Sequence, residues 1–338
     1  MKKVYLYPLT ARNKSVVVNP YMGNLRDALN ENFQVVNAKK PSTTGIFDIL
    51  RYLGKVDVVY FNWSEELPSL HRGRIQGIFL LLLLQCLKHS SIKVIWTLHN
   101  KESHFEKNSF LKKKLFAQML KRSDVIITHA KEGLGLIPDG KASFFTHHPV
   151  SNTYSLPEKR KEYFYEIIIW GNISPYKGIS AFLKFLEERG LIRKYRILLA
   201  GKITTQDLAK ELQAFSQKYD NLEIMDEFVE TEKLIELIQS SKITLFTYHS
   251  ESILSSGVLM DSLTYGATIV GPRVGAFKDL HELELIETYT DFNSLVGVVD
   301  PLLNSLEENH TRELRMAEFM EANSWSQFSS SLLKLFGQ

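Results

Sequence analysis

The stretch "EIIIWGNISPYKGI", Glu166 to Ile179, places a lysine at the point where an apolar strand passes into a helix. The β-branched block predicts a buried strand, and Gly171 allows the backbone to turn tightly after it. Lys177 and Gly178 open the next helix, whose free NH groups and dipole attract an anion. The stretch therefore predicts a strand, a turn and a helix with a cation at an anion site. Taken alone, it fits an ordinary solvated lysine at least as well.

The same alternation of β-branched blocks and amphipathic segments continues on both sides of this stretch, as in parallel α/β sheets. In the first half we expect strands at 3–9, 33–37, 56–63, 93–99, 124–129 and 142–148, and helices near 22–31, 45–54, 67–89 and 109–121. A polar, proline-containing linker follows. The pattern restarts with strands at 165–171, 195–201, 222–226, 242–248 and 267–271, with helices between them.

The predicted fold class is α/β, with two Rossmann-like doubly wound domains over residues 1–150 and 151–338. The last helix, 325–336, is amphipathic and fits against either domain. Sheets of this class bind ligands beyond the carboxyl ends of their strands, so functional residues are expected just after each strand.

Composition and charge narrow the class of protein and its partners. One cysteine, Cys86, excludes a disulfide framework and a Cys-based zinc site, and no secretory signal is visible, which favours the cytoplasm or the cytoplasmic face of the inner membrane. Residues 1–150 hold 22 lysines and arginines against 11 acidic residues, whereas residues 151–338 hold 19 against 27. The basic half predicts an anionic partner, such as a phospholipid surface met by peripheral contact or a lipid diphosphate. A merely soluble, mixed surface is the alternative. No familiar nucleic-acid-binding motif is present, so nucleic acid is not expected.

The apolar run Ile78 to Leu84 is too short to span a bilayer as a helix. We interpret it as a buried helix rather than one that rests on a membrane surface.

A second strand-to-helix junction strengthens the anion-site interpretation. Ser255, Ser256 and Gly257 precede a helix, and such small residues let a phosphate approach the first-turn NH groups. Asp261 follows Gly257 by four positions on the same helix face, where it can accept hydrogen bonds from ribose hydroxyls. An ordinary N-cap and a solvated aspartate are the alternative, but two such junctions in one half favour a nucleotide site.

Polar and aromatic residues follow the strands of the first half in the same way. His99 and Asn100 come directly after a strand, and His104 lies in the next loop. An imidazole there can bond a substrate hydroxyl or phosphate, although a lone histidine is more often structural. Further candidates at the same edge are Asn19, Tyr21, Gly23, Asn62 and Trp63.

The motifs "TLHN", "WGNISPYKG" and "SSGVLMDSLTYGATIVG", in this order and spacing, resemble a bacterial GT-B glycosyltransferase of family 4 and its capsular or exopolysaccharide relatives. The resemblance extends from "NPYMGNLRDAL" near the start to "SWSQFSSSLLKLF" at the end. It implies that the second domain binds a nucleotide sugar and the first an acceptor, facing each other across a cleft.

The resemblance also implies roles for individual residues. His99 would lie near the donor sugar and Lys177 would contact the donor diphosphate, and these two form the expected catalytic set. Ser256 and Gly257 would offer NH groups to the diphosphate, and Asp261 would hold the ribose. The remaining expected donor-side residues are Gly171, Asn172, Glu251 and Ser255.

The sequence departs from the family pattern at two positions. The family has two glutamates eight positions apart, but Ile253 stands eight positions before Asp261, and the nearest acid is Glu251. Asn172 stands where the family has an arginine. These departures favour the first alternative, a non-catalytic subunit that binds or stabilises a partner. A GT-B-like sugar-nucleotide epimerase is the second.

The function that the resemblance implies is transfer of a sugar from a nucleotide-diphosphate sugar to a glycan or polyprenyl-diphosphate-linked glycan, in capsular, exo- or lipopolysaccharide synthesis. It implies retention at the anomeric carbon, with no carboxylate nucleophile. No Asp-x-Asp element is present, so we expect no metal and no cofactor. An inverting enzyme would need a base, for which His99, His104 and Glu65 are the candidates.

Overall fold

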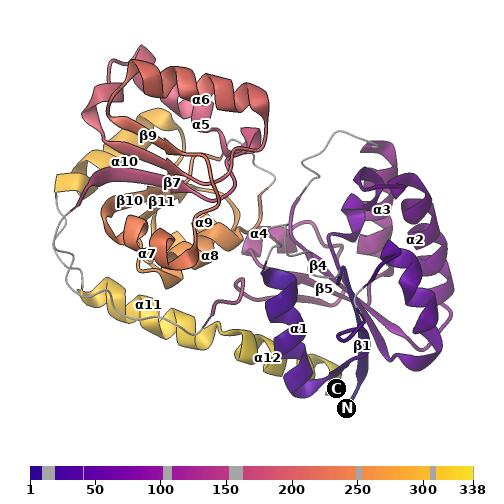
Figure 1. Cartoon of the computed structure of the whole chain (residues 1–338). Helices are drawn as coiled ribbons and strands as arrows, with labels where there is room; N and C mark the ends of the chain where they lie inside the picture. Colours follow the sequence, from indigo (N-terminus) through magenta and orange to yellow (C-terminus); the bar gives the residue numbers. More distant parts are fainter. Residues whose placement is uncertain are drawn as a thin grey trace. The chain divides into compact units, whose positions relative to one another are not determined.

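The computed structural model describes residues 1–9, 20–40, 42–101, 109–151, 163–248, 253–304 and 310–337, and these form two compact units. Unit 1 comprises Met1–Pro149, Ser252–Ser255 and Asn323–Gln338. Unit 2 comprises Val150–Glu251 and Ser256–Ala322. Each unit is an α/β fold built on a parallel sheet (Figure 1).

The sheet of unit 1 has the strand order β2-β1-β3-β4-β5-β6 among the described residues, and every neighbouring pair is parallel. Its strands are β1 (Lys3–Tyr7), β2 (Gln34–Val35), β3 (Val58–Asn62), β4 (Lys93–Leu98), β5 (Val125–Thr128) and β6 (Ser143–Phe145). Its helices are α1 (Tyr21–Asn32), α2 (Gly73–Leu87), α3 (Ser109–Arg122), α4 (Lys131–Leu134) and α12 (Trp325–Gly337), with 3-10 turns η1 (Gly45–Arg51), η2 (Leu53–Lys55) and η3 (Ser64–Ser69).

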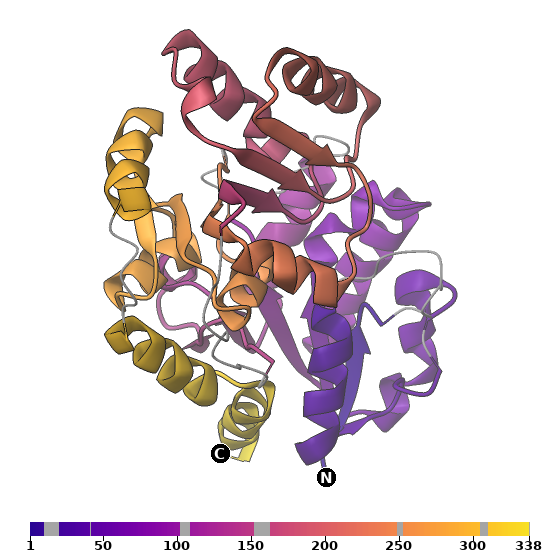
Figure 2. The same cartoon turned by 60° about the vertical axis from the view of Figure 1, so that its left-hand side comes forward.

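Helices cover both faces of this sheet. Helices α1 and α12 pack together, and their apolar side chains share one core with alternate strand residues such as Val4 and Leu6. Helices α2 and α3 lie side by side elsewhere in the unit (Figures 1 and 2). All five residues of β3 are buried, as expected for a central strand of a parallel sheet.

Two helix predictions for unit 1 are wrong in detail. The segment predicted as a helix over 45–54 forms the 3-10 turns η1 and η2 instead. Gly45 there has φ +69°, and Asp48 accepts bonds from the backbone NH groups of Thr43 and Thr44, so the segment is fixed by local polar contacts. The segment 67–89 is divided, with η3 ending at Ser69 and α2 beginning at Gly73.

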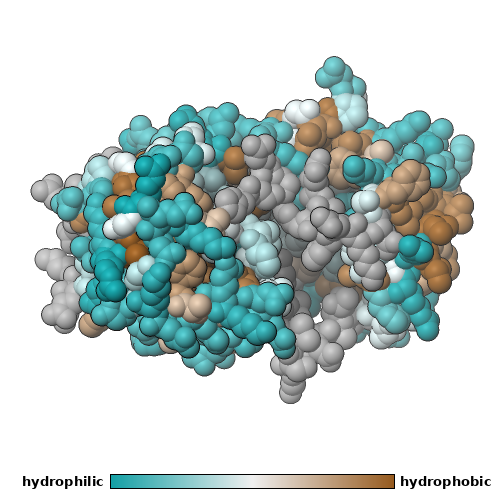
Figure 3. All heavy atoms as spheres, turned by 90° about the horizontal axis from the view of Figure 1, so that it is seen from above, coloured by the Kyte–Doolittle hydropathy of each residue, from teal (hydrophilic) through white to brown (hydrophobic). Residues whose placement is uncertain are grey.

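Helix α2 is also less buried than the sequence suggested. Leu80, Leu83 and Leu84 are buried, but Ile78 is 53% exposed and Leu82 is 63% exposed. The interpretation of the apolar run as a wholly buried helix is therefore wrong for its outward face. Apolar surface is visible at the right-hand end of Figure 3, the side on which Figure 1 draws α2 and α3.

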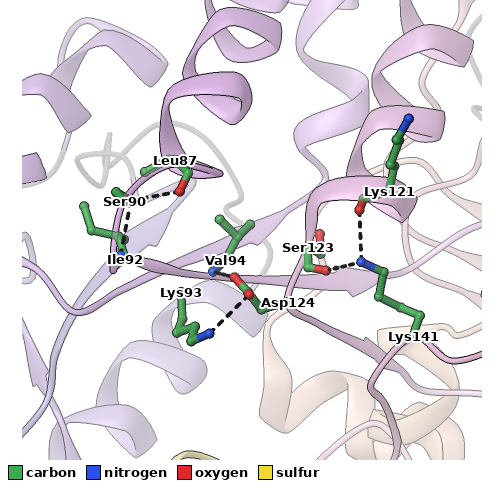
Figure 4. Close-up of polar contacts among 9 residues, drawn as sticks. All are labelled: Leu87, Ser90, Ile92, Lys93, Val94, Lys121, Ser123, Asp124 and Lys141. Atoms are coloured by element: carbon green, nitrogen blue, oxygen red, sulfur yellow. Dashed lines mark hydrogen bonds and ion pairs between the residues drawn. The ribbon is translucent and has the colours of Figure 1, made fainter.

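Polar contacts hold together the edge of the unit 1 sheet at which its strands begin (Figure 4). Asp124 accepts from the backbone NH of Val94 at 2.7 Å and pairs with Lys93 at 3.4 Å. The Lys141 ammonium donates to the carbonyl oxygens of Lys121 and Ser123 at 3.0 and 2.8 Å, which satisfies the end of α3. These side chains stabilise the fold, and ligand binding is expected at the other edge, where the strands end.

The sheet of unit 2 has the order β12-β11-β10-β7-β8-β9 among the described residues, and it is also parallel throughout. Its strands are β7 (Tyr165–Trp170), β8 (Ile197–Ala200), β9 (Leu222–Met225), β10 (Ser241–Leu245), β11 (Ile269–Pro272) and β12 (Glu287–Tyr289). Its helices are α5 (Ile179–Glu188), α6 (Gln206–Lys218), α7 (Thr231–Gln239), α8 (Gly257–Thr264), α9 (Gly275–Glu282), α10 (Phe292–Asn304) and α11 (His310–Ala322), with 3-10 turns η4 (Pro175–Lys177) and η5 (Ile192–Lys194).

Alternate residues along the strands of unit 2 point into its hydrophobic core. Ile167 and Ile169 of β7 face the same core as Ile197 and Leu199 of β8, and α5, α6 and α10 cover that face. Helices α7, α8 and α9 lie on the other side of the sheet (Figure 1). Strand β12 was not predicted, because this three-residue edge strand is too short to carry a periodic signal.

Candidate functional site

The first junction of unit 2 is built on a close approach of two glycines. Gly171 follows β7 with φ +87°, and Gly201 follows β8 with φ +143°, both in the region that disfavours side chains. A Cβ on Gly201 would lie 2.2 Å from the carbonyl oxygen of Gly171. The two glycines therefore let the backbones after β7 and β8 pack directly against each other, with Gly201 buried.

Lys177 lies beside this glycine pair and is 4% exposed. Its ammonium donates to the carbonyl oxygen of Trp170 at 2.8 Å, and it lies 3.2 Å from the position that a Cβ on Gly171 would occupy. None of the ion pairs found between the described residues involves Lys177. Burial lowers the pKa of Lys177 to about 7. The site thus holds a dehydrated cation that an anionic ligand would stabilise.

The first turn of α8 approaches the same place. Val258 lies 3.1 Å from the Cβ position at Gly171, so Lys177 and the start of α8 flank one glycine. The Ser256 hydroxyl caps the helix by accepting from the Leu259 NH at 3.4 Å. Gly257 is exposed, and a Cβ there would meet nothing within 4 Å. The first NH groups of α8, which have no partner within the helix, are therefore open to an anion.

Asp261 lies one turn further along α8 and lines a pocket of about 360 Å³. Burial raises the pKa of the Asp261 carboxyl to about 6. The other described residues that line the pocket are Ser151, Thr231, Ile235, Gln239, Thr264 and Tyr265. A poorly hydrated carboxylate in a pocket of mixed polarity can accept hydrogen bonds from ligand hydroxyls.

The other predicted donor-side residues do not all lie at this site in unit 2. Asn172 is exposed beside Gly171. Ser255 belongs to unit 1, and its hydroxyl is buried without a partner among the described residues. Its neighbour Ile253 forms an isolated bridge with Asn100, which follows His99. Glu251 lies outside the described residues, as do the acceptor-side candidates Asn19 and His104.

In unit 1, His99 lies in a buried aromatic environment at the carboxyl end of β4. Its ring stacks on Trp63 at 4.1 Å, and Trp63 itself has φ +48°, a strained conformation for a tryptophan. The His99 Nε2 donates to the Asn62 Oδ1 at 2.9 Å, which leaves the lone pair on Nδ1. Burial, together with the nearby His129 and His148, holds the His99 pKa well below its usual value, so the ring is neutral.

His129 and His148, which were not predicted as site residues, form a histidine cluster with His99 and Tyr21. The Tyr21 ring lies 4.9 Å from His99, 5.8 Å from His129 and 5.1 Å from His148. His129 Nδ1 donates to the Thr146 carbonyl, so its Nε2 accepts from the Tyr21 hydroxyl at 2.9 Å. Burial lowers the pKa of His129 to about 3 and that of His148 to about 4.

The signal that could have found these histidines was present in the sequence. The stretch "DVIITH" places His129 directly after a strand, as "WTLH" does for His99, and "SFFTHH" places His147 and His148 two and three residues after one. Since parallel strands end at one edge, the three histidines had to meet there. The predicted residues Tyr21, Asn62, Trp63 and His99 are thus brought together. Gly23 lies in the first turn of α1, as Tyr21 does.

Glu65, a candidate base in the sequence analysis, is held inside unit 1. Its carboxylate accepts from the Trp96 indole NH at 3.1 Å, and burial raises its pKa to about 7. Glu65 is therefore a buried partner of Trp96 in η3, which favours a structural role.

Comparison with known proteins finds the fold among solved structures. No protein-family model matches the sequence, and no curated protein sequence matches it. Sucrose-phosphate synthase from Thermosynechococcus elongatus superposes with a TM-score of 0.69 at 13% identity, over 100% of this chain and 99% of that one. HepE from Anabaena, solved with UDP, superposes with a TM-score of 0.68 at 9% identity, over 100% of both chains. The trehalose-6-phosphate synthase OtsA gives a TM-score of 0.64 at 14% identity, over 100% of this chain and 99% of that one.

These structural neighbours are GT-B glycosyltransferases. The identities of 9 to 14% leave the family within that fold open. The chain has the GT-B fold, with two Rossmann-like α/β units.

Proposed function

We propose that this chain is a glycosyltransferase of the family 4 type whose unit 2 binds a nucleotide-diphosphate sugar. The observation that carries the proposal is the buried ammonium of Lys177, which lies between the Gly171 turn and the start of α8. Placing a cation there is unfavourable unless an anion shares the site. A diphosphate supplies that anion, and two structural neighbours, HepE and an α-glucosyltransferase, were solved with UDP.

The remaining donor contacts follow from the geometry of α8. Asp261 lies four residues after Gly257, roughly 6 Å along the helix axis. A diphosphate at the Gly257 NH groups would therefore place its ribose near the Asp261 carboxylate. The pocket of about 360 Å³ beside Asp261 has room for a nucleoside.

In this proposal, unit 2 stabilises the departing nucleoside diphosphate. Lys177 and the first NH groups of α8 are fixed donors aimed at oxygens that gain negative charge as the sugar leaves, and such preorganised donors are the main source of electrostatic catalysis. We propose that these groups suffice without a metal ion or cofactor. We further propose retention of the anomeric configuration, with a donor phosphate oxygen receiving the proton of the acceptor hydroxyl.

The proposal assigns unit 1 to the acceptor. The neutral His99 ring offers Nδ1 as an acceptor for a sugar hydroxyl, and the buried Asn62 Nδ2 has no partner among the described residues. Trp63, which is half-buried, adds aromatic surface of the kind that sugars stack on. We propose a glycan or polyprenyl-diphosphate-linked glycan as the acceptor, in capsular, exo- or lipopolysaccharide synthesis.

The first test is a thermal-shift panel of the full chain with UDP, GDP, ADP, CMP and dTDP, each with magnesium and with EDTA. A diphosphate at about 100 times its Kd stabilises unit 2 by about 2.7 kcal/mol, which raises its melting temperature by several degrees. We expect one diphosphate to produce this shift in EDTA and Lys177→Ala to abolish it. Lys184→Ala, which removes an exposed lysine of α5, should keep the shift. No shift from any nucleotide would refute the donor site.

A non-catalytic subunit is the second candidate, and Ile253 is the observation that favours it. The family's first glutamate would stand at this position, but Ile253 is 4% exposed and pairs with Asn100. Hydrolysis of the nucleotide-sugar donor distinguishes a glycosyltransferase from a non-catalytic subunit. A glycosyltransferase releases free sugar slowly from its donor when no acceptor is present, and Lys177→Ala should stop this release. Nucleotide binding without any release would favour the subunit.

A further inference from the structure

The outward side of α2 is apolar where a surface helix is normally polar. Ile75, Ile78 and Leu82 are 61, 53 and 63% exposed and follow one another at helical spacing. Phe79, half-buried on the same side, contacts Phe47 of η1 with ring centroids 4.9 Å apart. Leu50 lies one 3-10 turn after Phe47 and is 58% exposed. We call these six residues the α2 patch.

The neighbouring helix α3 presents cations to solvent. Lys113, Lys114 and Lys121 are exposed and spaced along one face of α3. Lys112, by contrast, is 3% exposed and pairs with Glu66 at 2.9 Å, so it belongs to the interior. The two helices are held together where Arg122 donates to the Gln85 side chain at 2.8 Å.

Neither helix contains an acidic residue. The sequence of α2 carries Arg74 and is followed by Lys88, and α3 carries five cations and no anion. The outward side of the α2–α3 pair is therefore an apolar stripe next to a uniformly basic one. Neighbouring exposed apolar side chains beside a basic stripe mark an interaction site rather than ordinary solvent-exposed surface.

We propose that the outward side of α2 and α3 binds an anionic phospholipid surface. The α2 patch would enter the boundary between headgroups and acyl chains, and the α3 lysines would pair with anionic headgroups. Helix α2 has 15 residues, fewer than the roughly 20 that span a bilayer, so it would lie along the surface. Across the described ranges, none of the helices qualifies as a membrane span by length and hydropathy. A second copy of the chain fits this side poorly, because a two-fold contact would bring the lysines of both copies together.

The test is co-sedimentation of the full chain with vesicles of phosphatidylcholine alone or mixed with phosphatidylglycerol. We expect binding to the mixed vesicles that weakens as salt is raised. Ile78→Ser with Leu82→Ser should lower the partition coefficient about tenfold or more. Lys113→Glu with Lys114→Glu should do the same and should abolish the preference for phosphatidylglycerol. All four side chains are exposed, so these variants should fold.

Matched variants in unit 2 control for general changes in hydropathy and charge. Leu314→Ser removes an apolar side chain that is 54% exposed, and Lys210→Glu with Lys278→Glu makes the same change in net charge. Both controls should bind vesicles as the unaltered chain does. If the α2 and α3 variants bind vesicles as strongly as the unaltered chain does, the proposal is overturned. It is also overturned if the unaltered chain binds no vesicles but forms a dimer, measured by light scattering, that the α2 variant does not form.

This inference does not depend on donor binding, because the vesicle assay contains no nucleotide. A chain that binds vesicles but no nucleotide would contradict the proposed function alone. A chain that binds UDP but no vesicle would contradict the membrane surface alone.

Discussion

Lys177 shows how burial changes the chemistry of a single residue. A lysine in water has a pKa near 10.5, but at this position the ammonium has lost most of its hydration and the pKa is lowered to about 7. Close to neutral pH the empty site is therefore charged in only part of the molecules. A bound diphosphate favours the charged form, so nucleotide binding and protonation of Lys177 are coupled.

This coupling predicts how nucleotide affinity varies with pH. Between about pH 7 and pH 9 the empty protein loses the Lys177 proton, so binding UDP must take up a proton and affinity should fall by up to tenfold per pH unit. Lys177→Arg, whose side chain stays charged, should bind with nearly constant affinity over this range. Isothermal titration calorimetry in buffers of different ionisation enthalpy measures both affinity and proton uptake. Equal pH dependence in the two proteins would show that Lys177 does not titrate with binding.

For single residues, the sequence predicted where in the fold a side chain lies better than how deeply it is buried. Gly171, Lys177 and Gly257 could be assigned to one edge because strand ends in a parallel sheet share an edge. The lowered pKa of Lys177 could not be predicted, because it depends on how completely neighbouring segments exclude water. The contact between Tyr21 and His129 was equally hidden, since it joins residues 108 positions apart.

At the scale of elements, α12 determines part of the shape of unit 1. It packs on α1, and its buried residues Phe328 and Leu332 join the core that holds Tyr21 and Leu25. Phe328 also lies 6.0 Å from the His129 ring. Helix α12 therefore supports both the α1 core and the histidine cluster, although it comes from the other end of the sequence.

Replacing Phe328 with alanine tests this support. Removing a buried phenylalanine leaves a cavity and should lower the free energy of unfolding of unit 1 by about 3 to 5 kcal/mol. Leu333→Ala, on the same helix but 42% exposed, should cost much less. Urea unfolding followed by hydrogen exchange resolves the two units, and the amides of unit 2 should be unaffected by either change. A similar loss in both variants would mean that α12 is held by features other than this core.

Element prediction from sequence succeeded where the periodic signal was long. The strands over 58–62 and 93–98 are bounded by apolar blocks with clear ends, and both were expected. The segment 45–54 also has helical spacing, but Gly45 and the bonds that Asp48 accepts override it. Helix α2 was recognised, yet its exposed side could not be known before α3 was seen to cover only the other side.

At the scale of the whole molecule, the two units contain buried basic side chains whose protonation affects stability in different pH ranges, acidic for unit 1 and alkaline for unit 2. Unit 1 holds neutral His99, His129 and His148, whose pKa values are depressed from 6.5, and unit 2 holds Lys177, depressed from 10.5. In each case the unfolded chain binds a proton more readily than the folded unit. Stability is therefore complete above the unfolded pKa and is lost as pH falls toward the folded pKa.

The pH dependence of melting should differ between the units accordingly. Unit 1 should lose stability as pH falls from about 6.5 to about 4, by up to about 1.4 kcal/mol per pH unit for each buried histidine. Unit 2 without nucleotide should gain stability as pH rises from about 7 toward 10, because folded Lys177 has lost its proton over this range whereas unfolded Lys177 still holds it. Scanning calorimetry with separate transitions for the units measures both slopes. His148→Gln should reduce only the acid slope of unit 1, and Lys177→Met should flatten only the alkaline slope of unit 2. If neither variant changes a slope, the buried bases do not control the pH response, and other titrating groups must account for it.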